Sequence, residues 1–527
     1  MLRGLNREAS HTYTMQVEAE INPVNTTVER DATRVHIRGS SLLLGGQCLS
    51  LGINFAAQVL VVRYFSTGDY GALAFGLGIV GLFQIVAVLG LNEAVARFVP
   101  IYHQNREYEK LVGTILLATG AVILSGVIII LAVYGPLSHF LTQEKLALRL
   151  LTILIFLVPI EAADTLLDAL FASFAGTRDI FFRKYMLGPG LKFGVVLFLI
   201  WKNSTITFLA YGYLLASAVG VLTYIWMLLR LLEDQGLLRQ LKSLTIQVPT
   251  SEILSFVLPG LSSTLATAAI ASINIFLLGH LRSMPDVAYY RAVVPAAQLN
   301  GVVMASFTLM YIPSAARLFA KSDYAGFNKL YWQTAAWMSV VSFPIFAVTF
   351  SLSRPLTVLL FGARYEQSGS ILALLSLASY FNTALGFNLQ TLKVLGRLRY
   401  IIVMSALGVL IDVVVSMFLI VRYGAIGAGI GTAVALISYN LLMQVGLLPT
   451  PNFKAFDRRY FSIYLTIALG ASGLLVIQSL MSLSLYVALP LVVCISMMVL
   501  TVAKKKLNIL ETFPELLSLP FTRLLLT

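Results

Sequence analysis

The sequence predicts an all-α, polytopic membrane protein with about fourteen transmembrane helices. Three observations support this prediction. Hydrophobic residues make up 58% of the 527 positions and charged residues only 12%, and the mean hydropathy is +0.85. A water-soluble domain of this length could not bury so much apolar side chain. Apolar runs of about 20 residues, the length that crosses ~30 Å of hydrocarbon, recur along nearly the whole chain.

Taken in order, the apolar runs give fourteen expected spans. The connections between them are short, so no sizeable soluble domain is expected. The spans lie near 41–62, 70–91, 111–133, 149–170, 186–201, 207–229, 252–279, 290–312, 333–352, 369–392, 401–420, 425–446, 461–480 and 485–503.

The first 40 residues are polar and lack the apolar segment of a cleavable signal peptide. Span 1 is therefore expected to direct membrane insertion. Residues 1–40 and 504–527 are expected to form tails, and the sequence leaves open whether translation starts at Met1 or Met15.

The Lys and Arg residues are distributed unevenly between the two ends of the predicted helices. The two tails and the even-numbered loops together hold 27 of them, whereas the odd-numbered loops hold 8. This asymmetry follows the positive-inside rule, so both termini are expected in the cytosol. The formal net charge of +13 would then face anionic lipid headgroups, and no nucleic-acid partner is expected.

The chain also repeats itself at an offset of 217 to 220 residues. The aligned pairs, each at an equivalent helix junction, are Asp69 with Asp286, Arg97 with Arg317 and Gly176 with Gly396. A parallel repeat of two six-helix lobes would produce this pattern.

The repeat predicts how the chain is divided. An N-lobe at 41–230 (spans 1–6) and a C-lobe at 252–446 (spans 7–12) are expected, joined by a cytosolic linker at 231–251. Spans 13 and 14, at 461–503, are then an addition to the two lobes.

The segment TGDYGALAFGLGIVGLFQIVAVLGLNEAVARFVPIYHQNREYEKL resembles the N-terminal lobe of polysaccharide-biosynthesis flippases, which transport lipid-linked oligosaccharides such as O-antigen precursors. These flippases belong to the multidrug/oligosaccharidyl-lipid/polysaccharide exporter superfamily. The matching features are Asp69-Tyr70-Gly71 at the start of span 2, Gly90-Leu91 near its end, Ala96 to Pro100, and FASFAGTRDIFFRKY after span 4. The resemblance covers roughly residues 35–505.

The resemblance implies two six-helix lobes around a central cavity that opens alternately to each side of the plasma (inner) membrane. It implies translocation of a polyprenyl-pyrophosphate-linked oligosaccharide from the cytoplasmic to the outer leaflet, for surface polysaccharide synthesis. The expected partners are this lipid-linked saccharide, membrane lipids, and polysaccharide polymerase and export proteins.

The alternative is a cation-coupled multidrug or metabolite exporter of the same superfamily. That group commonly has twelve spans, so fourteen favour the flippase. No catalytic residue, metal site or cofactor is expected, because the outward loops are short and carry no paired carboxylates. A coupling ion, H⁺ or Na⁺, stays open, as do the energy source, the sugar composition and the oligomeric state.

Span 4 carries three carboxylates, Glu161, Asp164 and Asp168, on one arc of an apolar helix. Each would cost about 2.5–3.5 kcal/mol facing lipid, so the arc is expected to face the interior. Lys192 of span 5 lies at a depth similar to Asp164 and is the expected partner. Either an ion pair holds spans 4 and 5 together, or Glu161 or Asp164 binds a coupling ion.

A lipid-linked pyrophosphate needs cationic partners, and arginine can bond two of its oxygens at once. The candidates are Arg63 at the end of span 1, Arg291 at the start of span 8, and Lys192. The alternative for the two arginines is that they anchor helix ends at the membrane interface.

Asp412 in span 11 is the one acidic residue deep in the second half. It is either a coupling site or the partner in a structural hydrogen bond. Arg97 and Arg317 lie at cytoplasmic junctions, where they either set the topology or form a gate between the lobes.

Overall fold

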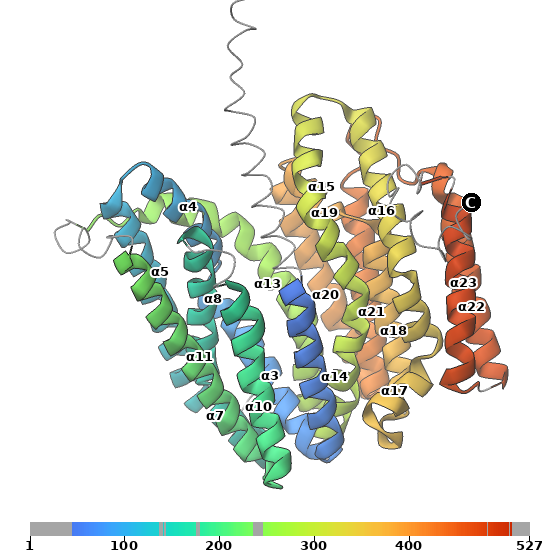
Figure 1. Ribbon diagram of the computed structural model, residues 1–527, viewed down its shortest axis with the longest axis horizontal. Coiled ribbons are helices and arrows are strands. Elements are labelled where there is room, and N and C mark those ends of the chain that lie inside the picture. The colour runs from blue at the N-terminus through green and yellow to red at the C-terminus, as the bar shows by residue number, and fades with distance from the viewer. Residues whose placement is uncertain are drawn as a thin grey trace, which may run out of the picture.

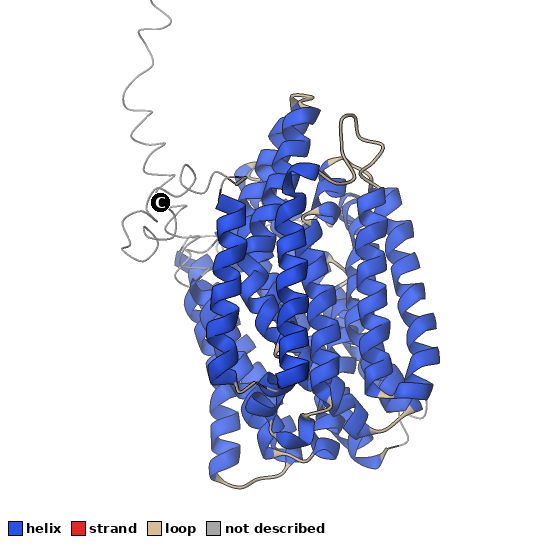
Figure 2. Ribbon diagram, turned by 90° about the vertical axis from the view of Figure 1, so that its right-hand side faces the viewer, coloured by secondary structure: helices blue, strands red, loops and turns tan. Residues whose placement is uncertain are grey.

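A computed structural model describes residues 45–135, 141, 144–174, 180–234, 246–481, 483–504 and 506–507. These residues form helices and connections without a strand, as Figure 2 shows. The predicted tail at 1–40, most of the predicted tail at 504–527 and most of the predicted linker at 231–251 lie outside the described residues.

The predicted fold class is confirmed. Within the described ranges, 12 helices are long and apolar enough to cross a membrane, or up to 14 if each of two bent pairs counts as one span. The helices of the first half are Gly45–Tyr64, α3 (Thr67–Val88), α4 (Leu91–Gln104), α5 (Tyr108–Tyr134), α7 (Lys145–Leu154), α8 (Leu157–Phe174), the π-helix η1 (Phe181–Leu187), α10 (Gly188–Trp201) and α11 (Ile206–Asp234).

The second half begins with the two bent spans. Its helices are α13 (Thr250–Leu281), α14 (Met284–Gln298), η2 (Leu299–Gly301), α15 (Val302–Ala320), α16 (Tyr324–Phe346), η3 (Ala347–Ser351), α17 (Ser353–Phe361), η4 (Ala363–Tyr365), α18 (Ser368–Leu385), α19 (Asn388–Val394), α20 (Leu398–Tyr423), α21 (Ala425–Val445), η5 (Arg458–Tyr460), α22 (Phe461–Met481) and α23 (Leu485–Lys504). Below, "the first helix" is Gly45–Tyr64, "the Gly45 end" is the end of the bundle where it starts, and "the Tyr64 end" is the opposite one.

Figure 1 shows how the helices are grouped. Helices α3 to α11 lie on one side and α15 to α23 on the other, with the first helix, α13 and α14 between them. Helices α22 and α23 lie at the edge of the molecule and pack against α16.

Both α3 and α14 begin with a serine whose hydroxyl donates to the aspartate three positions on, although only the serine of α3 also accepts from that aspartate's amide. The Ser66 hydroxyl donates to Asp69 Oδ2 at 2.7 Å and accepts from the Asp69 amide, and Ser283 donates to Asp286 at 2.7 Å. A carboxylate in the first turn of a helix also complements its dipole. Asp69 and Asp286 are the residues that the sequence repeat aligns, so both copies of the repeat begin with the same serine-to-aspartate hydrogen bond.

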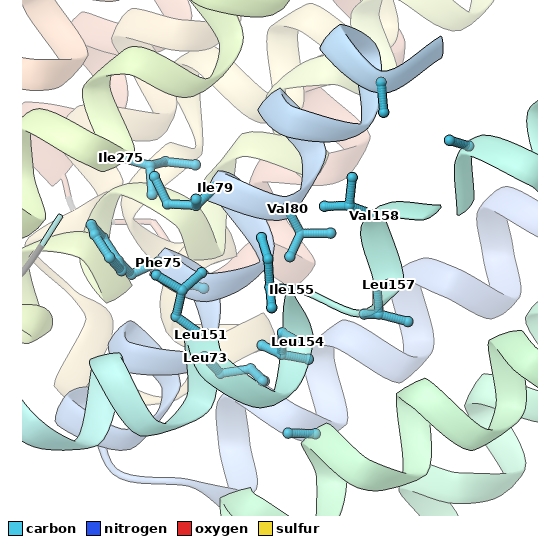
Figure 3. Packing of buried hydrophobic residues seen from close by; sticks show 14 of the residues in the cluster. Leu73, Phe75, Ile79, Val80, Leu151, Leu154, Ile155, Leu157, Val158 and Ile275 are labelled. Carbon is cyan, nitrogen blue, oxygen red and sulfur yellow. The ribbon is translucent and has the colours of Figure 1, made fainter. Parts of the chain in front are cut away.

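The division into two lobes stays a prediction, because the buried apolar side chains do not separate at the linker. One hydrophobic cluster joins most of the first half to α13, α14 and parts of α17 to α21, and a second cluster is built from α15 to α23. Figure 3 shows the centre of the first cluster, where α3 packs between α7, α8 and α13. Its labelled residues are Leu73, Phe75, Ile79, Val80, Leu151, Leu154, Ile155, Leu157, Val158 and Ile275.

One span is broken where its backbone is fully enclosed by protein. Between α18 and α19, Gly386 has a φ of +84°, which glycine adopts without steric cost. Carbonyls freed at the break accept tyrosine hydroxyls: Tyr331 donates to Leu385 at 2.5 Å and Tyr464 to Ala384 at 2.8 Å. Irregular backbone at membrane depth needs such partners.

The two halves approach most closely at the Tyr64 end, where α3 meets α14. A Cβ atom on Gly71 would lie 1.8 Å from the Met284 carbonyl oxygen. Only a glycine allows this distance, so residue 71 fixes how near the two helices lie.

Gly71→Ala is expected to lower the free energy of unfolding by about 1–3 kcal/mol, the usual cost of overpacking. Thermal unfolding in detergent measures this as a lower midpoint. Gly81→Ala on the same helix is the control, because nothing lies within 4 Å of the added methyl group. Equal midpoints for the two variants would contradict the close packing of α3 on α14.

Candidate functional site

Two neighbouring cavities are lined mainly by helices of the first half, with α14 of the second half completing the larger one. The larger, about 360 Å³, is lined by the first helix, α3, α8, α10, α11 and α14. The smaller, about 200 Å³, lies towards the Gly45 end between the first helix, α8, η1, α10 and α11. Asn54, Glu161 and Lys192 line both, so the two form one continuous space.

The three carboxylates of α8 all face the smaller cavity, and each has a cation. Lys192 Nζ lies 2.7 Å from Glu161 Oε1, and Lys184 Nζ lies 2.8 Å from Asp168 Oδ2. Arg183 forms the third pair, with Asp164. The expectation that this arc faces the interior is confirmed.

The predicted pairing of Lys192 with Asp164 is wrong, because Lys192 pairs with Glu161 instead. Span 5 begins at Phe181, about a turn earlier than expected, and its first turns are the π-helix η1. Arg183 is therefore on the cavity face beside Asp164, and Lys192 lies level with the preceding turn of α8. π-Helices inside spans are frequent at functional sites.

Sequence reasoning missed Arg183, because it lies before the predicted start of span 5 near residue 186. Its side chain is only 5% exposed, and its guanidinium carbon lies 4.2 Å from the centre of the Tyr224 ring. The signal was in the charge balance: three carboxylates on one arc need three cations, and Lys184 and Arg183 are the basic residues nearest to Lys192 in the sequence.

Glu161 is held from more sides than the other two carboxylates. Its Oε1 also accepts from the Ser217 hydroxyl at 2.9 Å. Its backbone carbonyl accepts from Gln84 at 3.3 Å, and so α8 is tied to both α3 and α11. Glu161 and Lys192 stand where the two cavities meet.

Arg291 lines the larger cavity from α14. The salt bridges found in the described part of the chain do not include it. The helix turn that carries it is held in place by Gln58, which donates to the carbonyls of Arg291 and Ala292 at 3.4 and 3.2 Å. Tyr70, another lining residue, accepts from the same amide at 3.3 Å. The cavity therefore contains three balanced ion pairs and one guanidinium without a carboxylate.

Arg63, the third predicted ligand of pyrophosphate, is not among the residues that line either cavity. Its guanidinium donates to the carbonyls of Leu360, at 2.7 Å, and Leu359. The structure thus brings together Lys192 and Arg291 but leaves Arg63 at the Tyr64 end.

Asp412 is fully buried among α13, α14, α20 and α21. Its Oδ1 accepts from Asn274 at 2.9 Å and from Ser416 at 3.1 Å. Asn274 also donates to Thr432 at 2.8 Å, which in turn bonds the Tyr290 hydroxyl at 2.9 Å. Asp412 Oδ2 and Asn274 Oδ1 have no hydrogen-bond partner among the described residues. The cluster therefore keeps two buried acceptor oxygens without donors.

The two predicted gate arginines differ in their surroundings. Arg97 stacks on Phe256 of α13, 4.5 Å from the ring centre. Tyr102, also on α4, donates to Glu252 of α13 at 2.7 Å. Arg317 donates only within its own helix, to Ser314 at 3.4 Å. Arg97 therefore joins segments from both halves of the chain, whereas the bond from Arg317 does not.

No group of three or more His, Cys, Asp or Glu side chains in the described ranges is arranged to hold a metal ion. Both cysteines, Cys48 and Cys494, are exposed and free. The observed site is a charged cavity inside a membrane bundle, with a separate polar cluster at Asp412.

Solved structures with the same fold are membrane transporters by their titles. The lipid II flippase MurJ, in an inward closed conformation, has a TM-score of 0.68 and 15% identity, over 88% of this chain and 99% of that one. An inward-facing multidrug resistance MATE transporter has a TM-score of 0.59 and 15% identity, over 81% and 95%. A transporter of the MOP superfamily from Pyrococcus furiosus has a TM-score of 0.53 and 15% identity, over 79% and 94%.

At 15% identity these structures establish the fold alone. No curated protein matches the sequence. A family model described as "Polysaccharide biosynthesis protein" matches residues 36–319, which is just over half of the chain. This match confirms the family resemblance seen in the sequence, and the chain is therefore a member of the polysaccharide biosynthesis protein family with the helical membrane fold of MurJ and the MATE transporters.

Proposed function

We propose that this protein is a flippase that translocates a polyprenyl-pyrophosphate-linked oligosaccharide from the cytoplasmic to the outer leaflet of the plasma membrane. The observation that carries the proposal is the cavity in which Arg291, without a carboxylate partner, lies with Lys192. A pyrophosphate is an anion that such a pair of cations can hold.

The fold supports this substrate class over a soluble one. MurJ, whose title names a lipid-linked substrate, is more similar than the MATE transporter by TM-score, 0.68 against 0.59. It also matches over nearly its whole length. The family description, polysaccharide biosynthesis, fits a saccharide on that lipid.

The charge on each side of the bundle gives the direction. The loops at the Gly45 end carry most of the Lys and Arg residues, so we assign this end, and both termini, to the cytosol. The smaller cavity lies towards that end. The lipid-linked pyrophosphate would enter from the cytoplasmic leaflet, exchange its water for Lys192 and Arg291, and leave at the Tyr64 end. Translocation makes and breaks no covalent bond, so no enzymatic activity is proposed.

Coupling to an ion is assigned to Asp412. Its free Oδ2 and the free Oδ1 of Asn274 would be satisfied by Na⁺, or by a proton carried on the Asp412 carboxyl group and donated to the amide. Glu161 and Asp164 are the weaker candidates, because Lys192 and Arg183 already neutralise them.

A cation-coupled exporter is the second candidate. The observation that favours it is the row of carboxylates in the cavity, since a cationic drug could displace Lys192 from Glu161. An exporter would need no cation such as Arg291 to hold an anionic headgroup.

Deletion of the gene in its host tests the proposal. The expected result is accumulation of lipid-linked saccharide on the cytosolic leaflet, measured by mass spectrometry with leaflet-selective chemistry, together with loss of surface polysaccharide. An unchanged lipid pool with greater sensitivity to toxic cations would overturn the flippase and favour the exporter.

Exchanging the charges of one ion pair tests the role of Lys192. The double variant Glu161→Lys, Lys192→Glu is expected to keep the pair and its thermal stability but to lose transport, because the cation no longer sits on α10. Each single variant is expected to be destabilised, but by less than the about 3–5 kcal/mol that breaking a fully buried pair costs, because the Lys192 and Glu161 side chains are 34% and 25% exposed.

The matched control is the exchange Asp168→Lys, Lys184→Asp on the same two spans. It is expected to keep both stability and transport. Full transport by the exchanged Glu161 and Lys192 pair would show that this pair serves only to hold the helices.

Asp412→Asn is expected to abolish stabilisation by the coupling ion. Wild-type protein in detergent should gain thermal stability as Na⁺ rises, because a ligand that binds only the folded state stabilises it by RT ln(1 + [L]/Kd). The same concentrations of choline serve as the control. A midpoint of thermal unfolding that changes with pH and not with Na⁺ would identify the ion as a proton. A midpoint that changes with neither would show that Asp412 has a structural role only.

A further inference from the structure

Two arginines at the Tyr64 end tie together segments far apart in the sequence. Arg63, on the first helix, donates through Nε to the Leu360 carbonyl at 2.7 Å and through Nη2 to the Leu359 carbonyl, at the end of α17. Arg364, which follows α17, donates through Nη2 to the carbonyls of Val62 at 2.8 Å and Arg63 at 2.5 Å. Each arginine therefore caps the end of the other's helix.

Helix ends explain why these bonds form. The last four carbonyls of a helix have no partner within it, and the negative end of the helix dipole attracts a cation. The planar fork of a guanidinium can reach two successive carbonyls, which an ammonium group cannot do in one geometry. These four carbonyls, at residues 62, 63, 359 and 360, find donors only while the first helix lies beside α17.

The contact lies beside the larger cavity, at its Tyr64 end. Val61, one turn or less from Arg63, and Tyr70 both line that cavity. Tyr365, next to Arg364, is fully buried and packs edge-on against Tyr289 of α14, with ring centres 5.7 Å apart. A path from the cavity that runs between these segments to the Tyr64 side opens only when the first helix leaves α17.

Arg282 provides the comparison that isolates this role. It lies 219 positions after Arg63, the offset of the sequence repeat, and makes the same forked contact: Nε donates to Ile420 at 3.0 Å, and Nη2 donates to Val421. Its target is the end of α20, which belongs to the same half of the chain as α13. One copy of the repeated arginine thus bonds within a half, and the other bonds between the halves.

We propose that Arg63 and Arg364 form a latch that holds the transporter closed at the Tyr64 end and must break in each transport cycle. The inference rests on the proposed function, because only a protein with alternating access has to open there. The latch lies at the end opposite to the contact of Arg97 with Phe256. The anionic pyrophosphate meets both guanidinium groups on its way out, and its oxygens compete with the carbonyls for them.

Thiol labelling measures the opening directly. With Cys48 and Cys494 replaced by serine, Ala57→Cys places one thiol on the wall of the larger cavity. A membrane-impermeant methanethiosulfonate reagent is then applied to full-length protein in vesicles of each orientation. Labelling from the Tyr64 side is compared for the parent and for Arg63→Gln, Arg364→Gln, the double variant and Arg282→Gln.

The expected result is labelling about tenfold faster in Arg63→Gln and Arg364→Gln, since each loses charge-assisted hydrogen bonds made only in the closed state. The double variant should label no faster than twice the faster single one, because the two residues serve one contact. Arg282→Gln should label at the parent rate. Arg63→Lys keeps the charge but loses the forked guanidinium, so its labelling rate should lie between those of the parent and Arg63→Gln. It serves as the test variant if Arg63→Gln fails to fold.

Equal labelling of Arg63→Gln, Arg364→Gln and Arg282→Gln would overturn the latch, as would faster labelling from the Gly45 side alone. The lipid-linked saccharide pool, measured in the same strains, separates this failure from failure of the proposed function. If lipid-linked saccharide accumulates on deletion but the arginine variants label at the parent rate, the latch is rejected and the flippase proposal stands. If deletion leaves the lipid-linked saccharide unchanged but Arg63→Gln and Arg364→Gln label faster, the latch stands and the proposed substrate is rejected.

Discussion

The hydrocarbon of a membrane contains no water, so each polar group within it must find a partner in the protein. Many polar groups of this structure have such a partner. The three carboxylates of α8 draw three cations from η1 and α10, and these pairs fix how spans 4 and 5 lie. The break at Gly386 is closed by tyrosine hydroxyls. Buried ion pairs add little net stability, so their main effect here is to select one arrangement of helices around a polar cavity.

The same constraint is left unmet at two places. Arg291 faces the larger cavity with no carboxylate bonded to it among the described residues, and Asp412 and Asn274 each keep a buried oxygen without a donor. An unpaired charged or polar side chain inside a membrane protein costs stability, and such residues are usually retained because they have a function. One place suits an anion and the other a cation, and the residues of both belong to helices of the second half of the chain. A transporter that couples an anionic headgroup to an ion requires two such places.

The sequence predicted the spans well, because a run of about 20 apolar residues is a direct imprint of membrane thickness. It also aligned Asp69 with Asp286, since a helix cap is a local pattern. It did not predict contacts between residues far apart in the sequence, or contacts whose acceptor is a main-chain carbonyl. Residue counting could not foresee the π-helix that moves Arg183 beside Asp164. The bonds of Arg63 go to main-chain carbonyls nearly 300 positions away, and no residue type marks a carbonyl.

The reciprocal capping of the first helix and α17 has a consequence for biosynthesis. Arg63 and the carbonyl of Leu360 are separated by 297 residues, which a ribosome adds in roughly 15–60 seconds at ~5–20 residues per second. With the proposed cytosolic N-terminus, the end of the first helix stands during that interval at the far surface of the membrane without the bonds that Arg364 donates to its carbonyls. Assembly of the first half is therefore incomplete until α17 has crossed, and the protein matures as one chain in spite of its internal repeat.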